Sequence, residues 1–217
     1  MSRRDNAHNR CQGCGLHESL CLCQELPRLS TASKLCLVIH RDELRKPTNT
    51  GRLATRCLGE SRLLVHGEIG MRAGSPIAPQ ENLQPLLLYP GSEAEPLAAK
   101  HRDAGPVLLV VPDGTWRQAA KMSRRIEWMA ELPRVGLPEG ELTAYRLRSE
   151  PKEGGLATME AIARAFGILE GPAVQEELES IFRKMVDRTL YSRGLISRDQ
   201  VFGGVPEGTM RHEPRRI

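Results

Sequence analysis

The sequence predicts an α/β fold with a largely parallel sheet, because short apolar runs alternate with amphipathic helical patterns along most of its 217 residues. The clearest apolar run is Val107–Val111, which is typical of a strand buried on both faces. The clearest helical pattern spaces apolar residues three or four apart between Trp116 and Met129. A cysteine-rich segment precedes this alternation and predicts a small metal-binding unit.

The remaining elements follow from shorter patterns. Apolar runs predict strands at residues 34–40, 61–66, 86–89 and 134–137. Capping residues and helical spacing predict helices at about 49–58, 96–101, 115–129, from 158, and at 173–191. The charged segment 41–48 and the Gly/Pro-rich segment 67–79 are expected to be loops.

Three parts are expected along the chain. Residues 1–30 form the cysteine-rich knuckle, residues 31–200 the α/β domain, and residues 201–217 a flexible basic tail rich in Gly, Pro and Arg. One domain with a small appendage suits a chain of this length.

Composition excludes several classes of protein. A hydrophobic content of 40% and a charged content of 27% are ordinary for a soluble globular protein and exclude a fibrous or wholly disordered chain. No apolar run approaches the roughly 20 residues that a membrane span needs. Residues 1–10 are polar and do not resemble a secretory signal, so we expect a cytoplasmic location and no membrane partner. The net charge of +4 permits a polyanionic partner without requiring one.

Four of the six cysteines are closely spaced. Cys11, Cys14, Cys21 and Cys23 form the pattern C-x2-C-x6-C-x-C. In a reducing compartment such thiols are better explained as thiolates on zinc than as a disulfide framework. An iron–sulfur cluster, or a histidine (His8 or His17) in place of one sulfur, is an open alternative. Cys36 and Cys57 lie in apolar contexts and are expected to be buried hydrophobic residues.

Polar side chains follow three of the predicted strands. They are His40 and the residues after it, the turn 89–91, and the turn 113–116 with the sequence Asp-Gly-Thr-Trp. Ligands of parallel sheets bind beyond the carboxyl ends of strands, so we expect one site built from all three. Alternatively, Asp113 or Thr115 is only a helix cap and Trp116 a core residue. Walker-type and Rossmann glycine motifs are absent from the sequence.

Five ordered blocks together resemble the DTW-domain family. They are the cysteine cluster, H-x-x-E-x-x-K-x-T-N-T-G at 40–51, D-G-T-W at 113–116, Y-R-L-R at 145–148 and L-A-T-M-E-A at 156–161. The resemblance extends from Cys11 to about Gly167. The family includes tRNA-uridine aminocarboxypropyltransferases and is related to the SPOUT methyltransferases. It implies a SPOUT-like sheet flanked by helices, with a C-terminal trefoil knot.

The resemblance also implies a reaction. Such enzymes transfer the 3-amino-3-carboxypropyl group of S-adenosylmethionine to N3 of a uridine in tRNA, at position 47 in bacterial members, and release 5′-methylthioadenosine. The implied partner is tRNA, and a monomer is slightly favoured. The resemblance places S-adenosylmethionine against Tyr89, Pro90, Gly91, Asp113, Thr115, Trp116, Tyr145, Arg148 and Thr158.

Uridine N3 is a poor nucleophile until its proton leaves, and a carboxylate at a strand end is a natural base. Asp113 is therefore the catalytic candidate, either as the base or as a group that orients the uracil. Arg148 and the helix start near Thr158 can bind the substrate carboxylate. Trp116 can stack on a base.

Phosphate contacts hold folded RNA, so basic and polar residues around the expected crevice are candidates for RNA binding. The residues are Arg41, Lys46, Asn49, Thr50, Arg52, Arg124 and Arg125. Solvated charged faces are the alternative explanation. Two other functions stay open at this point: a SPOUT-like RNA methyltransferase, and a zinc-knuckle protein that binds RNA without catalysis.

Overall fold

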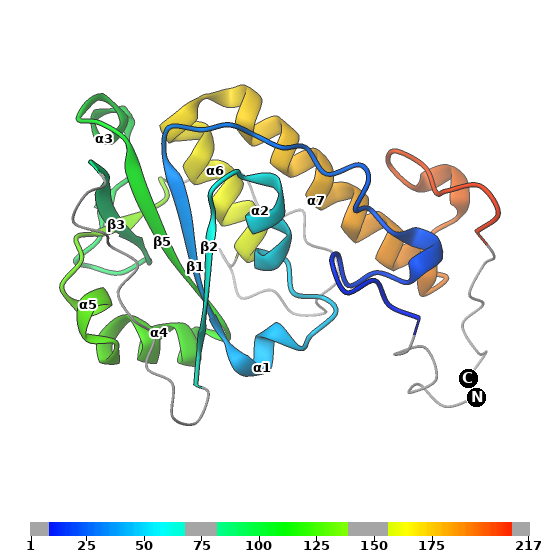
Figure 1. The fold of residues 1–217 in the computed structure, drawn as a ribbon, viewed down its shortest axis with the longest axis horizontal. Coiled ribbons are helices and arrows are strands. Elements are labelled where there is room, and N and C mark those ends of the chain that lie inside the picture. The colour runs from blue at the N-terminus through cyan, green and yellow to red at the C-terminus, as the bar shows by residue number, and fades with distance from the viewer. Residues whose placement is uncertain (1–8, 68–81, 139–155, 210–217) are drawn as a thin grey trace.

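In the part of the chain that the structure describes, six parallel strands form one sheet, in the order β2-β1-β5-β3-β6-β4. This computed structural model describes residues 9–67, 82–138 and 156–209 (Figure 1). The strands are β1 (Lys34–His40), β2 (Arg62–His66), β3 (Gln84–Leu88), β4 (Glu95–Pro96), β5 (Val107–Asp113) and β6 (Arg134–Gly136). The predicted α/β class and parallel sheet are confirmed.

Helices connect the strands and cover the sheet. They are α1 (Arg41–Leu44), α2 (Gly51–Cys57), α3 (Ala99–Asp103), α4 (Trp116–Arg125), α5 (Glu127–Ala130), α6 (Thr158–Glu170) and α7 (Pro172–Ser192). Two 3₁₀ turns, η1 (Glu18–Leu20) and η2 (Arg198–Gln200), lie near the two ends of the described chain.

The two central strands have apolar residues on both faces, and each face has its own core. Leu109 and Val111 pack with α2, α6 and α7, whereas Leu108 and Val110 pack with α4 and α5. Figure 1 shows the same division, with α4 and α5 on one side of the sheet and α6 and α7 on the other. A side chain of β5 therefore reaches the α6 face or the α4 face according to its position in the alternation.

The carboxyl ends of β1, β2 and β5 meet at one edge of the sheet. Ile39 pairs with Asp113, and His40 pairs with His66. Asp113 continues the alternation of Leu109 and Val111 toward α6, while His40 continues that of Val38 toward α4. The polar strand ends therefore share one edge, but His40 and Asp113 point to opposite faces of the sheet, so the single site expected from all three strand ends is not formed by His40 and Asp113 together.

Three local predictions are wrong. The helix expected at 115–129 is interrupted at Ile126, whose backbone is extended (φ −81°, ψ 108°) and whose side chain is buried. The loop expected at 41–48 begins with α1, because the His40 imidazole accepts a hydrogen bond from the Asp42 amide. The segment expected as a helix from 96 contains β4 and then α3.

The cysteine-rich segment is fixed to the rest of the protein by a buried arginine of α7. Arg188, 2% exposed, donates to the carbonyls of Cys21 (3.1 Å) and Gly204 (3.1 Å) and to the carboxylate of Glu25 (2.6 Å). In Figure 1 the blue N-terminal segment accordingly lies beside the C-terminal end of α7 and the orange segment after it.

The tail predicted from residue 201 is held in place over its first part. Val201 and Thr209 are buried, and the Thr209 hydroxyl donates to the carbonyl of Ser19 (2.8 Å). The sequence expectation failed here because these contacts link residues 190 positions apart. Residues 210–217 lie outside the described residues.

Among the described residues, no helix has the length and apolar content that crossing a bilayer would need.

Candidate active site and metal centre

Asp113 is the centre of a buried polar cluster at the end of β5. Its side chain is 4% exposed, and each carboxylate oxygen accepts a short hydrogen bond. The amide nitrogen of Asn49 donates to Oδ2 (2.6 Å), and the hydroxyl of Thr158 donates to Oδ1 (2.6 Å). These bonds join the D-G-T-W turn to the T-N-T-G segment and to the start of α6. Three of the five sequence blocks therefore meet at one carboxylate.

The backbone of α2 approaches this carboxylate closely at Gly51. A Cβ atom at position 51 would lie 2.8 Å from Oδ2 of Asp113 and 3.1 Å from both Leu37 and Thr158. Real Cβ atoms essentially never come within 3.0 Å of a neighbouring atom, so only glycine fits here without displacing Asp113. This explains the glycine at the end of the T-N-T-G segment.

Asn49 and Thr50 link the start of α2 to α6. Oδ1 of Asn49 accepts a hydrogen bond from the Arg52 amide (3.1 Å), which satisfies one free donor of the first turn of α2. The Thr50 hydroxyl accepts from the Met159 amide (3.3 Å) in the first turn of α6. Both side chains are thus used inside the protein, although they were predicted to contact RNA.

Two aromatic side chains lie at the same edge of the sheet. Tyr89 follows β3, and its ring is 6.4 Å from that of Trp116 in an edge-to-face arrangement. Trp116 is 46% exposed, so it is not a core residue. Thr115 caps α4 by accepting a hydrogen bond from the Gln118 amide. The alternative prediction, in which Thr115 is a helix cap, is therefore correct for this residue. Pro90 and Gly91 are exposed beside Tyr89.

The basic residues expected near the crevice have different surroundings. Lys46 forms an ion pair with buried Glu43 (2.6 Å), and Arg52 donates to the carbonyls of Leu44 and Gln12. Arg41, with Asp42 at 3.7 Å, is exposed, as are Arg124 and Arg125 on α4. Their assignment as RNA contacts stays a prediction. Tyr145 and Arg148 lie outside the described residues.

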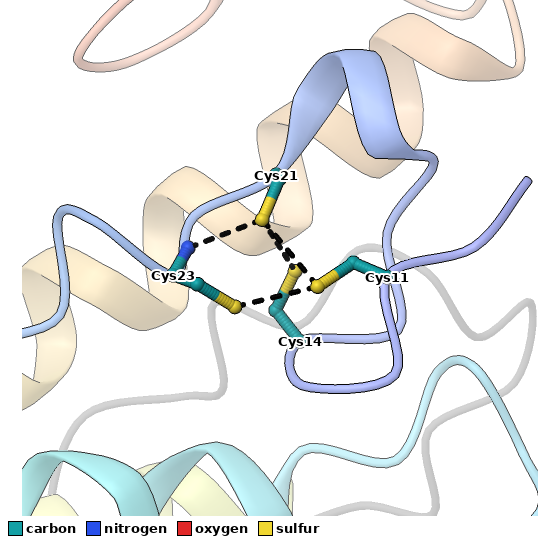
Figure 2. A group of neighbouring side chains, drawn as sticks. All are labelled: Cys11, Cys14, Cys21 and Cys23. Atoms are coloured by element: carbon teal, nitrogen blue, oxygen red, sulfur yellow. Dashed lines mark hydrogen bonds between the residues drawn. The ribbon is translucent and has the colours of Figure 1, made fainter.

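The four clustered cysteines converge on one point (Figure 2). All four sulfur atoms lie within 4.8 Å of one another, with Cys11–Cys23 at 3.4 Å and Cys14–Cys21 at 3.8 Å. Four sulfurs held at about 2.3 Å from a tetrahedral zinc ion would be about 3.8 Å apart. The cluster can therefore hold a metal ion. Its thiols are free, as are buried Cys36 and Cys57, which match their expected role.

The acidities of these thiols differ strongly. Burial raises the pKa of Cys21 to about 12, whereas hydrogen bonds outweigh burial at Cys11 and lower its pKa to about 6. Thiols this close cannot all lose their protons without a compensating cation, because neighbouring thiolates repel one another. A bound metal ion would supply that positive charge.

One arginine outside the cysteine segment contacts the cluster. Nη1 of Arg56, on α2, donates to Sγ of Cys23 (2.9 Å). A Cβ atom at Gly13 would collide with the same guanidinium. Sequence reasoning missed Arg56, because nothing in the pattern of α2 relates it to residues more than thirty positions earlier. The burial of Arg188, in contrast, could have been predicted, since this residue continues the buried stripe of α7 formed by Leu178, Ile181 and Met185.

The fold and site together define an α/β protein with a parallel sheet, a carboxylate-centred site at its carboxyl edge and a four-cysteine cluster. The sequence matches the DTW domain family over residues 8–190, so the chain belongs to that family. The recognition made from the five sequence blocks is confirmed.

Curated relatives share one name. The chain is 28% identical to "tRNA-uridine aminocarboxypropyltransferase 2" of Drosophila melanogaster over 80% of this chain and 72% of that protein. It is 28% identical to "tRNA-uridine aminocarboxypropyltransferase A" of Arabidopsis thaliana over 86% and 84%. Among solved structures, it is similar to the SAM-dependent rRNA:acp-transferase Tsr3 from Vulcanisaeta distributa, with a TM-score of 0.47 and 18% identity over 73% and 77% of the two chains.

Proposed function

We propose that this protein is a tRNA-uridine aminocarboxypropyltransferase. It transfers the 3-amino-3-carboxypropyl group of S-adenosylmethionine to N3 of a tRNA uridine, at position 47 of the variable loop, and releases 5′-methylthioadenosine. The observation that carries the proposal is the Asp113 cluster. It joins three blocks of a family whose curated members bear this enzyme name.

The reaction forms a bond between N3 and carbon and breaks the N3–H bond and a carbon–sulfur bond. N3 loses its proton and bonds to the carbon of the amino-acid arm next to sulfur. The carbon–sulfur bond breaks, and its electron pair stays on the sulfur of 5′-methylthioadenosine. S-adenosylmethionine supplies a carbon activated by the positive sulfonium. Since all three carbons on that sulfur are activated, the protein selects the product by positioning.

Asp113 is the residue that we assign to the uridine N3 proton. An ionised carboxylate has about four acceptor positions, and Asn49 and Thr158 each donate to one oxygen of Asp113. The two fixed bonds hold the carboxylate in one orientation. That geometry suits either proton removal or orientation of the uracil by a hydrogen bond from N3–H.

The aromatic pair and the adjacent turn are the co-substrate wall in this proposal. Tyr89 and exposed Trp116 offer ring faces to adenine or uracil, and Pro90 and Gly91 extend the wall without bulky side chains. We assign Thr115, Tyr145, Arg148 and Thr158 to the same wall. Arg148 would pair with the substrate carboxylate. The Thr158 hydroxyl acts on the site through Asp113.

We further propose zinc as the ion of the four-cysteine cluster, since the sulfur spacing and an all-sulfur donor set suit it. A site closed by four cysteines has no open position for substrate, so its role is structural. The free thiols suit a reducing cytoplasmic location.

A trefoil knot of the SPOUT type is part of the proposal. The chain leaves β6, on the far side of β3, and returns at Thr158 beside Asp113.

The test uses the purified protein, an unmodified tRNA transcript and S-adenosylmethionine labelled in the carboxyl carbon or, separately, in the methyl group. The expected result is carboxyl label in tRNA, no methyl label, and one equivalent of 5′-methylthioadenosine. Mass spectrometry of the nucleosides then locates the modified uridine. Methyl label with S-adenosylhomocysteine would identify a methyltransferase instead. Failure to bind S-adenosylmethionine would leave a non-catalytic RNA-binding protein.

A further inference from the structure

A cavity of about 530 Å³ lies at the carboxyl edge of the sheet, on the face opposite Asp113. Its floor is formed by His40 and His66 at the ends of β1 and β2. Its wall is one side of α4, from which Arg117, Lys121 and Arg125 line it. The cavity is distinct from the Asp113 cluster. Asp113 pairs with Ile39, and the next residue, His40, points to the opposite face of the sheet.

The three cations form a row with helical spacing. They are four residues apart on α4, so their side chains lie on one side of the helix. The row is about 12 Å long along the helix axis, at 1.5 Å per residue. That length exceeds a single phosphate group and suits a short run of phosphates.

In the described part of the chain, these cations also lack acidic partners, unlike several other surface cations. Lys34 pairs with Glu60, Lys46 with Glu43, and Arg102 with Asp103. Within the described ranges, Arg117, Lys121 and Arg125 form no ion pair. Among the described residues that line the cavity, Asp42 is the single acidic one, and it lies 3.4 Å from Nδ1 of His40. The cavity thus holds an excess of positive charge.

The floor of the cavity offers hydrogen-bond donors as well. Nδ1 of His40 accepts from the Asp42 amide (3.3 Å) and lies 3.1 Å from the side-chain nitrogen of Gln118. Since a backbone amide can only donate, the ring proton of His40 lies on Nε2. The ring of His66 is 6.4 Å away, and burial, with a smaller effect of His40, lowers the pKa of His66.

The cavity adjoins the candidate active site along the chain. Thr115 and Gln118 line it, and exposed Trp116 lies between Thr115 and Arg117 in the first turn of α4. A nucleotide strand in the cavity would therefore lie next to the first turn of α4, which carries Trp116.

We propose that this cavity binds consecutive backbone phosphates of the substrate RNA next to the modified uridine, through Arg117, Lys121 and Arg125. The inference rests on the proposed function, since it supplies the RNA-docking surface of that site. It also shifts the docking residues from the pair Arg124–Arg125 to the row facing the cavity. Arg124 donates to the Ala120 carbonyl and does not line the cavity.

The test compares tRNA binding by the full chain and by the triple variant Arg117→Ala, Lys121→Ala, Arg125→Ala over a series of salt concentrations. Loss of three phosphate contacts should lower the slope of log affinity against log salt by roughly two units. Affinity at low salt should fall roughly tenfold or more. Arg124→Ala is the matched control, with the same kind of charge change on the same helix, and should bind like wild type.

A charge-retaining variant, Arg117→Lys plus Arg125→Lys, should keep the salt slope, because lysine also contacts phosphate. S-adenosylmethionine affinity should be unchanged in every variant, which reports intact folding. A triple variant with the slope of Arg124→Ala, or a wild-type protein that does not bind tRNA, would overturn the inference. Transfer of the labelled carboxyl carbon by wild type tests the proposed function separately. If the triple variant loses tRNA binding but wild type transfers no label, the docking cavity is supported and the proposed enzyme activity is rejected.

Discussion

The hydroxyl of Thr158 donates a hydrogen bond of 2.6 Å to Oδ1 of Asp113, a residue 45 positions earlier in the chain. This contact fixes the first residue of α6 against the last residue of β5. The start of α6 is therefore joined directly to the D-G-T-W turn. Asn49 joins the start of α2 to the same turn through the other oxygen.

Replacing Asp113 by asparagine separates proton removal from shape. The amide oxygen of the substituted side chain can still accept from Asn49, and the Thr158 hydroxyl can turn to accept from the new amide nitrogen. We expect turnover to fall by about 10²–10⁴ if the carboxylate takes the N3 proton. S-adenosylmethionine affinity, measured by calorimetry, should change little.

Thr158→Val is the companion variant, because it removes one donor but leaves a carboxylate that can accept a proton. Its turnover should fall less than that of Asp113→Asn, because the carboxylate that can take the N3 proton is still present. Near-normal turnover in Asp113→Asn would move the base elsewhere, or mean that the uridine ionises without help from the protein.

Gly51→Ala tests the close approach of α2 to the carboxylate. The added methyl would lie 2.8 Å from Oδ2 of Asp113, so the cluster must shift. Overpacking of this kind costs about 1–3 kcal/mol, and we expect reduced turnover together with a lower free energy of unfolding. Gly136→Ala is the control, since its nearest neighbour, Ala94, is at 3.7 Å. Equal activity of the two variants would contradict a tightly positioned Asp113.

The sequence predicted the elements that depend on local pattern. The apolar run at Val107–Val111 and the stripe of α7 are readable because buried strands and helices repeat their side chains regularly. The meeting of His40, Tyr89 and Asp113 at one edge followed from the parallel sheet alone. Membership of the DTW domain family followed from the order of the blocks.

Contacts between distant segments were beyond the reach of pattern. Asn49 and Thr50 look like RNA contacts in the sequence, but in the structure they serve Asp113 and the Met159 amide. The cavity of α4 needs the register of β1 and β2, because only this pairing brings His66 beside His40. Helical spacing also did not reveal the extended backbone of Ile126.

Arg188→Met should destabilise the fold by about 2 kcal/mol or more, since it leaves the carbonyls of Cys21 and Gly204 without their donor and removes the ion pair with the partly exposed Glu25. Met has a similar length and keeps the packing. Arg193→Met, at an exposed position after α7, is the control and should be nearly neutral. Urea unfolding of both variants measures the difference. Equal stabilities would mean that the cysteine segment is held to α7 by other contacts.

Glu25 predicts a loss of stability in acid. Partial burial alone would raise its pKa, but hydrogen bonds from Arg188 and Lys184 outweigh it, so the pKa is lowered from 4.5. A lowered pKa in the folded state means that the stabilisation is fully present above about pH 4.5 and disappears as the pH falls through the folded value. Glu25→Gln lacks this contribution. The difference in free energy of unfolding between wild type and this variant should therefore become smaller as the pH falls from about 6 to about 3. A constant difference in urea unfolding would contradict the assignment.

The four-cysteine cluster predicts a structural metal with a defined stoichiometry. Metal analysis should give one zinc ion per chain, because the four sulfurs have the spacing of a tetrahedral site. Cys21→Ser plus Cys23→Ser should lose the zinc and lower the melting temperature, since metal binding stabilises the folded segment. Cys36→Ala changes a buried cysteine outside the cluster and should keep one zinc ion per chain.

Arg56 sharpens the same test, because its guanidinium neutralises part of the negative charge of four thiolates and donates to Cys23. Arg56→Ala should leave zinc bound at one equivalent but release it to a chelator faster than wild type, by roughly tenfold or more. Arg62→Ala, which changes the charge equally from the neighbouring strand β2, should release zinc at the wild-type rate. Iron in place of zinc, or full zinc content in the double cysteine variant, would refute the assignment of this metal to these four residues.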